Sequence, residues 1–238
     1  MPCYLVTAGS SREMIDRVRD WGNIFTGKTG LGIAQALAKS GGAVDLVTSN
    51  RDHLADLAKL TQGDAGVVNG VPYRSHSDLL DAIDRLMKQH RYDAIFMSAA
   101  VADYAPSGAF EVVSRETLPE GMERWTVRPA HGAKLPSTFA HLAFLGTPTE
   151  KIVDRFRSVW NHRGILVKFK LQVGLSKDEL IAIGQASRKA SGADYLVANT
   201  LEMVEGPEPG AWLLGDGFEE WVPRATLAAR LVTLVKKK

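Results

Sequence analysis

Residues 5–32 read LVTAGSSREMIDRVRDWGNIFTGKTGLG, and this stretch decides the fold. A short apolar run ends at Ala8-Gly9-Ser10, a long polar segment follows, and glycines then open a helical pattern. A short apolar run that ends in a turn is typical of a buried parallel strand. A helix that begins on glycines offers free backbone amides to phosphate groups. The stretch therefore predicts a strand, loop and helix that bind a nucleotide or a phosphate.

The residues that follow extend this unit into a sheet. Apolar residues recur at helical spacing in residues 30–40, and residues 43–48 (AVDLVT) form a second apolar run. A strand, a helix and a strand in this order predict a right-handed parallel crossover. Residues 77–89 repeat the helical pattern, and residues 92–98 (YDAIFMS) repeat the strand. We expect an α/β, Rossmann-like, doubly wound and mostly parallel sheet that binds ligands beyond the carboxyl ends of its strands.

The composition changes between residues 105 and 150. Five prolines and short alternating apolar runs there favour an arm or flap of hairpins rather than a core layer. The patterns that follow predict helices at 152–160, 177–191 and 224–235, strands at 165–173 and 195–198, and a hairpin at 211–222. Because no linker interrupts the chain, we expect a single α/β domain over residues 1–238 that carries this arm.

Composition and charge narrow the class of protein. The 238 residues are 45% hydrophobic and 24% charged, which is usual for a globular enzyme and excludes a disordered or fibrous chain. The 29 basic and 27 acidic residues are interspersed, so nucleic acid is not an expected partner. The single cysteine, Cys3, suits a reducing compartment. With no signal peptide or membrane-length apolar run, we expect a complete, cytoplasmic protein.

Two common nucleotide-binding motifs compete for the opening stretch. Residues 22–29 (GNIFTGKT) satisfy the Walker A pattern, but a phosphate loop of that kind follows directly on a buried strand. The residues before Gly22 are charged and predict no strand, so we regard this match as coincidental.

Residues 30–54 look like the start of a short-chain reductase, which needs a tyrosine with a lysine four residues later. None of the five tyrosines has that lysine, and the glycines do not form G-x-G-x-x-G. An NAD(P)-dependent oxidoreductase and a non-catalytic nucleotide-binding protein nevertheless remain alternative functions.

The whole stretch fits a third pattern better. Residues 7–19 read TAGSSREMIDRVR, and Asn23 and residues 26–30 (TGKTG) follow them. Later segments read AAVADY at 99–104, AKL at 133–135 and VAN at 197–199. In this order the segments strongly resemble the phosphopantothenoylcysteine synthetase family, the ligase of coenzyme A biosynthesis. The resemblance covers nearly the whole chain.

The resemblance implies a reaction and its participants. The family joins 4′-phosphopantothenate to cysteine through an acyl-nucleotidyl intermediate, with ATP or CTP as co-substrate and Mg²⁺ as cofactor. Residues 169–171 (FKL) resemble the single-function branch, and no flavin-binding half precedes them, so a stand-alone ligase is expected. The family also implies a homodimer, and no membrane partner is expected.

The resemblance also implies roles for individual residues. Asn23 would hold the intermediate, and Lys134 would be a mobile cation that closes over the phosphates. Asp103 would hold the nucleotide or its metal, although no protein ligand to a metal is assigned with confidence. The remaining expected nucleotide- and phosphate-binding residues are Gly9, Ser10, Gly27, Lys28, Gly30, Ala99, Ala100, Phe169 and Asn199.

The sequence departs from the family pattern in a few places. Ile24 and Phe25 replace a polar residue and a serine, so we expect a less polar pocket beside Asn23. Lys168 stands where a glycine is common. The basic residues Arg188 and Lys189 have an uncertain register relative to the triphosphate, and the choice between ATP and CTP stays open.

Overall fold

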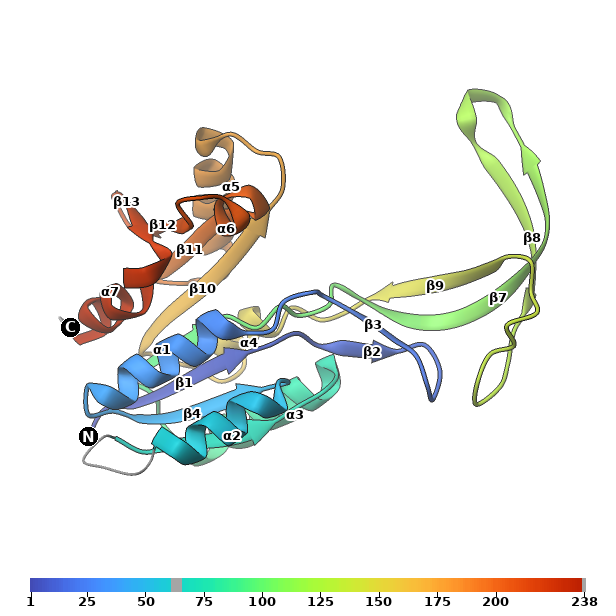
Figure 1. Cartoon of the computed structure of the whole chain (residues 1–238). Coiled ribbons are helices and arrows are strands. Elements are labelled where there is room, and N and C mark those ends of the chain that lie inside the picture. The colour runs from blue at the N-terminus through green and yellow to red at the C-terminus, as the bar shows by residue number, and fades with distance from the viewer. Residues whose placement is uncertain (61–65, 237–238) are drawn as a thin grey trace.

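The main sheet of the computed structural model, which describes residues 1–60 and 66–236, has eight strands (Figure 1). Their order is β13-β12-β11-β10-β6-β1-β4-β5. The strands are β1 (Cys3–Ala8), β4 (Ala43–Thr48), β5 (Val68–Pro72), β6 (Ala94–Met97), β10 (Ile165–Gln172), β11 (Tyr195–Thr200), β12 (Gly210–Gly215) and β13 (Phe218–Pro223). The first six in chain order are parallel to one another. β12 runs antiparallel to β11, and β13 runs antiparallel to β12. The expected Rossmann-like, mostly parallel sheet is confirmed.

The strand order reverses next to β1. The chain runs from β1 outward to β4 and β5, and then crosses back to β6 on the other side of β1. In doubly wound sheets this reversal opens a crevice at the carboxyl ends of the strands. The ends of β1 and β6 are tied together there, because Ser10 and Ala100 form an isolated parallel bridge.

Helices cover both faces of the sheet. The helices are α1 (Lys28–Lys39), α2 (Arg51–Leu60), α3 (His76–Gln89), α4 (Ile152–Ser158), α5 (Lys177–Ala190), α6 (Leu201–Glu205) and α7 (Arg224–Lys236). One buried cluster joins alternate strand residues such as Val6 and Phe96 to α1 and α7. A second cluster joins the intervening residues, such as Leu5 and Ile95, to α3 and α4. Since both faces are buried, the strands carry nearly continuous apolar runs.

Residues 105–150, expected to form an arm, do form one. It consists of β7 (Tyr104–Thr117), β8 (Glu123–Pro129) and β9 (Leu142–Pro148), with a short 3₁₀ turn, η1 (Pro119–Gly121), between β7 and β8. In Figure 1 this three-stranded sheet projects away from the main sheet. Its base is tied down because Thr149 Oγ1 donates to the Ala102 carbonyl at 2.6 Å.

The prediction for residues 10–21 was wrong in one respect. They form no plain polar loop but a small hairpin, β2 (Arg12–Met14) and β3 (Asp20–Gly22). Glu13 is buried there and accepts a hydrogen bond from the His76 backbone amide at 2.8 Å. A charged side chain can be buried when its lone pairs are satisfied in this way. A strand, β3, therefore does lead into Gly22. It lies outside the main sheet, unlike the strand that precedes a Walker A loop.

Candidate functional site

A cavity of about 220 Å³ lies at the carboxyl edge of the sheet. The ends of β1, β6, β10 and β11 and the start of α1 form one side of it. β12 runs antiparallel to β11 and β13 runs antiparallel to β12, so the hairpin starts and ends at this edge. Its ends and the start of α7 therefore add Gly210, Ala211, Arg224 and Leu227 to the lining of the cavity. Seven of the residues expected to bind nucleotide line the cavity. They are Gly9, Gly27, Lys28, Ala99, Ala100, Phe169 and Asn199.

Glycine is required at two points of the loop that enters α1. Gly27 has φ +81°, and a Cβ atom there would lie 2.1 Å from the backbone nitrogen of Gly9. Gly9 itself has φ +83°, and its Cβ atom would lie 2.1 Å from Ser49 Oγ. A residue with a side chain at either position would have to adopt a left-handed backbone conformation and would also clash with its neighbours. The loop can thus run directly over the end of β1, which brings the first amides of α1 to the cavity.

Asn23 lies next to the residues at the end of β6. Its Nδ2 donates to the Ala100 carbonyl at 3.2 Å, and the Ser11 amide donates to the same oxygen. The Ala99 amide is held by Thr7 Oγ1 at 3.0 Å. Asn23 does not line the cavity, but its bond to Ala100 fixes it at the cavity rim.

Three cationic side chains line the cavity: Lys28, Lys170 and Arg224. The sequence indicated only Lys28. Lys170 belongs to the FKL segment, so its place after Phe169 at the end of β10 could have indicated it. Arg224 gave no local signal, because the β12–β13 hairpin brings it to this edge. Three cations around one cavity suit a ligand with several negative charges.

The other expected residues lie outside the cavity. Ser10 is buried, and its amide donates to Ser49 Oγ at 2.9 Å. Gly30 is buried where α1 crosses the sheet, since its Cβ atom would lie 2.7 Å from Ala8 Cβ. Asp103 is exposed at the start of the arm and forms an ion pair with Lys151.

Lys134 is exposed on the loop between β8 and β9, away from the cavity. The residues beside it are held by the β2–β3 hairpin. The Asp16 carboxylate accepts from the Leu135 amide at 3.0 Å and from Arg19 Nε at 2.9 Å, and Arg19 Nη2 donates to the Leu135 carbonyl. The Arg19 guanidinium and the Leu135 amide hold the pKa of the Asp16 carboxyl well below its usual range. One carboxylate thus fixes the base of the segment that carries Lys134.

Replacing Asp16 with asparagine is expected to loosen residues 130–141, because an amide cannot form the ion pair with Arg19. Amide hydrogen exchange measures this loosening: residues 130–141 should exchange faster in Asp16→Asn than in the control variant Asp178→Asn, which changes an exposed aspartate. Since the folded pKa of Asp16 is depressed, its contribution to stability is fully present above about pH 4 and is lost as the pH falls further. Unchanged exchange at pH 7 would contradict the anchoring role.

The departures from the family pattern lie in different places. Ile24 is 79% exposed, whereas Phe25 lines the cavity, so only Phe25 makes the cavity less polar. Lys168 points away from it: its Nζ lies 3.4 Å from the Ser187 carbonyl of α5, and burial lowers its pKa. Arg188 is buried and donates to Gln185 Oε1, so it supports α5 rather than a ligand. Lys189 is exposed and does not line the cavity.

Within residues 1–60 and 66–236, no group of three histidine, cysteine or carboxylate side chains is arranged to hold a metal ion. None of the helices in this part of the chain is both long enough and apolar enough to cross a membrane.

Comparisons with known proteins agree with this architecture. The sequence model described as DNA/pantothenate metabolism flavoprotein C-terminal domain matches residues 3–116. The coenzyme A biosynthesis bifunctional protein CoaBC of Thermococcus kodakarensis is 30% identical over 237 residues, which are 98% of this chain and 50% of that protein. The chain therefore spans about half the length of the curated relatives that it matches.

Two solved structures share the fold. The DNA/pantothenate metabolism flavoprotein from Streptococcus pneumoniae has a TM-score of 0.75 at 22% identity, covering 99% of this chain and 98% of that one. A Cab2 variant in complex with phosphopantothenate-cysteine has a TM-score of 0.67 at 12% identity, covering 99% and 87%.

The parallel sheet, the glycine-lined start of α1 and the cavity at the strand ends define a Rossmann-like α/β protein with a crevice suited to an anionic ligand. The matching domain model covers the segments at 7–30 and 99–104, and the similarity to CoaBC extends over nearly the whole chain, through the segments at 133–135 and 197–199. Together, these similarities support a member of the phosphopantothenoylcysteine synthetase family.

Proposed function

We propose that this protein is a ligase that joins 4′-phosphopantothenate to L-cysteine in coenzyme A biosynthesis, with ATP or CTP as co-substrate. The observation that carries the proposal is the cavity beyond the strand ends, where Lys28, Lys170 and Arg224 surround the glycine-lined start of α1. Free amides at a helix start and three cations are a suitable environment for a triphosphate.

The proposed reaction has two steps. A carboxylate oxygen of 4′-phosphopantothenate attacks the α-phosphorus of the nucleotide, and the bond from that phosphorus to pyrophosphate breaks. The cysteine nitrogen then attacks the acyl carbon, the carbon–oxygen bond to the nucleotide breaks, and the amine loses a proton. Both steps depend on positioned donors and cations rather than on a nucleophilic side chain.

The location of each residue suggests its role in the proposed reaction. The cations would hold the phosphates, and Phe169 and Asn199 would border the base and the sugar. Asn23, at the rim, would donate a hydrogen bond to the acyl group without adding charge. Lys134 would act from the β8–β9 loop, in a closed arrangement of that loop over the phosphates.

Mg²⁺ would neutralise the phosphates of the bound nucleotide. Magnesium commonly keeps most of its ligands from water and phosphate and needs only one or two carboxylates. Asp103 is the candidate carboxylate, although its ion pair with Lys151 would first have to open.

The names of the relatives support this proposal. The curated relatives are described as proteins of coenzyme A biosynthesis, and the Cab2 structure holds phosphopantothenate-cysteine. The product of the proposed reaction has the same two components as that ligand.

The direct test is an assay of pyrophosphate release. Purified protein receives 4′-phosphopantothenate, cysteine, magnesium and either ATP or CTP, and cysteine is omitted in a matched control. We expect amide product in amounts equal to the pyrophosphate released, with a preference for one nucleotide. Absence of cysteine-dependent product with both nucleotides would refute the ligase and favour a non-catalytic binding role. Oxidation of added NADPH would instead support the reductase alternative.

We further propose that the protein is a homodimer joined through the arm. The arm exposes large apolar side chains on a thin sheet that has no core of its own. They include Tyr104 (55% exposed), Val113 (51%), Trp125 (47%) and Leu145 (56%). Apolar surface of this kind marks contact with another molecule.

Replacing Leu145 with glutamate is expected to shift the dimer toward monomer, because a charge would enter an apolar contact. Light scattering at micromolar concentration measures the mass. The matched control is Val159→Glu, since Val159 is equally exposed (55%) but follows α4, outside the arm. A wild-type monomer, or dissociation by the control alone, would contradict the proposal.

A further inference from the structure

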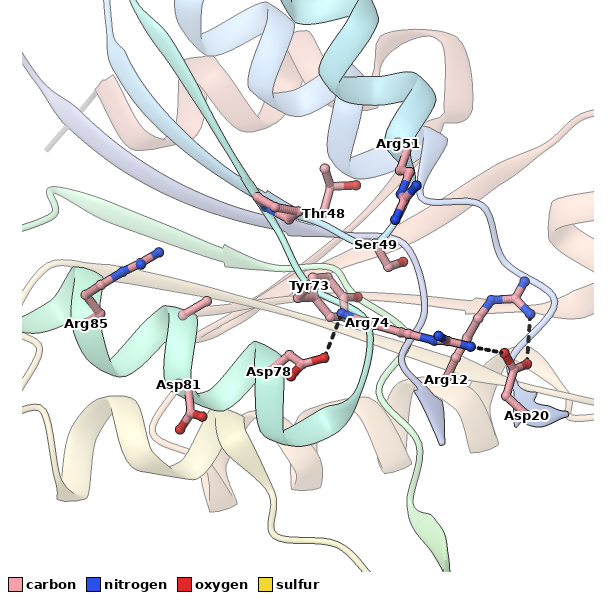
Figure 2. Close-up of a pocket in the computed structure, with 12 residues that line it drawn as sticks. Arg12, Asp20, Thr48, Ser49, Arg51, Tyr73, Arg74, Asp78, Asp81 and Arg85 are labelled. Atoms are coloured by element: carbon pink, nitrogen blue, oxygen red, sulfur yellow. Dashed lines mark hydrogen bonds and ion pairs between the residues drawn. The ribbon is translucent and has the colours of Figure 1, made fainter. Parts of the chain in front are cut away.

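A second cavity, of about 890 Å³, lies at the carboxyl ends of β4 and β5 (Figure 2). Its volume is within the range of small-molecule sites in proteins. It borders the first cavity, because Ser49 lines the second one while the Gly9 loop that Ser49 touches lines the first. The nucleotide-binding proposal uses the β6–β11 side of the crevice and leaves this side without a role.

Four arginines from four parts of the chain line the second cavity. Arg12 comes from β2, Arg51 from the start of α2, Arg74 from the loop after β5 and Arg85 from α3. The first and third are fixed by one carboxylate, since Arg12 Nη1 and Arg74 Nη2 lie 3.1 and 3.2 Å from the two oxygens of Asp20. Figure 2 shows both guanidinium groups converging on it.

The three carboxylates around the cavity do not cancel this positive charge. Asp20 is shared by two arginines, and Asp78 accepts from two backbone amides at the start of α3. Asp81 is the remaining acidic residue. Neither Arg51 nor Arg85 forms an ion pair in the part of the chain that the structure describes, and Figure 2 draws no interaction between either of them and the other residues of the lining. The cavity thus carries a net charge of one positive unit and two uncommitted guanidinium groups.

Two hydroxyl groups add neutral donors to the wall. Ser49 Oγ accepts a hydrogen bond from the Ser10 amide, which leaves its own proton for another acceptor. Tyr73 is only 6% exposed; its hydroxyl faces Ser49 but meets no group at hydrogen-bonding geometry among the described residues. Burial raises the pKa of Tyr73, so the phenol stays protonated and can donate. A buried polar group without a partner commonly marks a place that a water or a ligand completes.

We propose that this second cavity binds an organic phosphate, a small molecule with a phosphate or diphosphate group. Guanidinium groups bind phosphate oxygens through paired hydrogen bonds. In Rossmann-like sheets, an arginine near the end of the second strand can hold a phosphate on a ribose. Arg51 stands at that position, three residues after the end of β4. The site is separate from the proposed ligase chemistry and does not depend on it.

Calorimetric titration at low salt tests the site with two probes, sodium pyrophosphate and adenosine 2′-monophosphate. The variant Arg51→Gln/Arg85→Gln removes the two uncommitted charges. The matched control Arg91→Gln/Arg163→Gln removes two exposed arginines from a different cavity. Thermal denaturation without ligand shows whether each variant is folded.

We expect the first variant to bind at least one of the probes at least ten-fold more weakly than wild type, while the control keeps wild-type affinity. Both variants leave the first cavity unchanged, so probe that binds there contributes equally. Tighter binding of the nucleotide than of pyrophosphate would assign the site to a phosphorylated ribose, and the reverse order to a free diphosphate. Equal affinities in the variant and the control, or no binding of either probe, would overturn the proposal.

Discussion

Replacement of Asn23 with aspartate is expected to lower product formation at least about 100-fold, the loss usual when one donor to a reacting acyl group is removed. The Asn23 amide donates to the Ala100 carbonyl at 3.2 Å. An aspartate of the same shape has no proton to donate, and its charge would repel both that carbonyl and the anionic substrates. The ligase assay measures this loss.

The fold should survive the Asn23→Asp change, because Asn23 is exposed. A melting temperature within about 2 °C of wild type would show this. The control Asn161→Asp introduces the same chemical change at an exposed position that does not line the first cavity, and it should keep the wild-type rate. If Asn23→Asp were as active as this control, Asn23 would have no part in the reaction.

Gly27→Ala is expected to destabilise the protein by about 3 kcal/mol or more. The new methyl group would lie 2.1 Å from the Gly9 nitrogen and 2.7 Å from the Gly9 Cα, and alanine disfavours a φ of +81°. Both contacts are with backbone, so no side chain can turn away to relieve them. At about 2–4 °C per kcal/mol, the melting temperature should fall by roughly 10 °C.

The matched control lies in α1, the helix that Gly27 precedes. A Cβ atom at Gly32 meets nothing within 4 Å, so Gly32→Ala should raise stability by about 0.5–1 kcal/mol through its better helix propensity. Thermal denaturation of the pair separates the loop constraint from the general effect of a glycine replacement. Similar melting temperatures for the two variants would contradict the close contact between Gly27 and Gly9.

Periodicity predicted most of the main sheet. Residues 43–48 match β4, because the buried run is continuous and ends at turn residues. The same approach missed β5 (Val68–Pro72), which reads VNGVP and buries only its two valines. An edge strand with a glycine and a proline carries little apolar signal. The helix α2 (Arg51–Leu60) was missed as well, since charged residues dominate its exposed side.

The sequence predicted the cavity residues at the ends of the parallel strands better than those that follow the β12–β13 hairpin. Ala99 follows β6 and Asn199 lies near the end of β11, and the carboxyl ends of these parallel strands meet at one edge, so local motifs place them together. Gly27 reaches the same edge because it packs on Gly9 after β1. Arg224 reaches that edge only through the antiparallel β12–β13 hairpin, which no short motif encodes. The second cavity was missed for the same reason, because its arginines come from β2, α2, α3 and one loop.

The hairpin that returns the chain has a consequence for synthesis. The last helix, α7, packs beside α1 in one cluster, and Lys236 Nζ donates to the Ser40 carbonyl at 2.8 Å. On the ribosome, the residues of the opening stretch emerge first, and Arg224 and Leu227 emerge about two hundred residues later. A nascent chain could therefore display every family motif and still lack one wall of its first cavity, which closes only when its two ends meet.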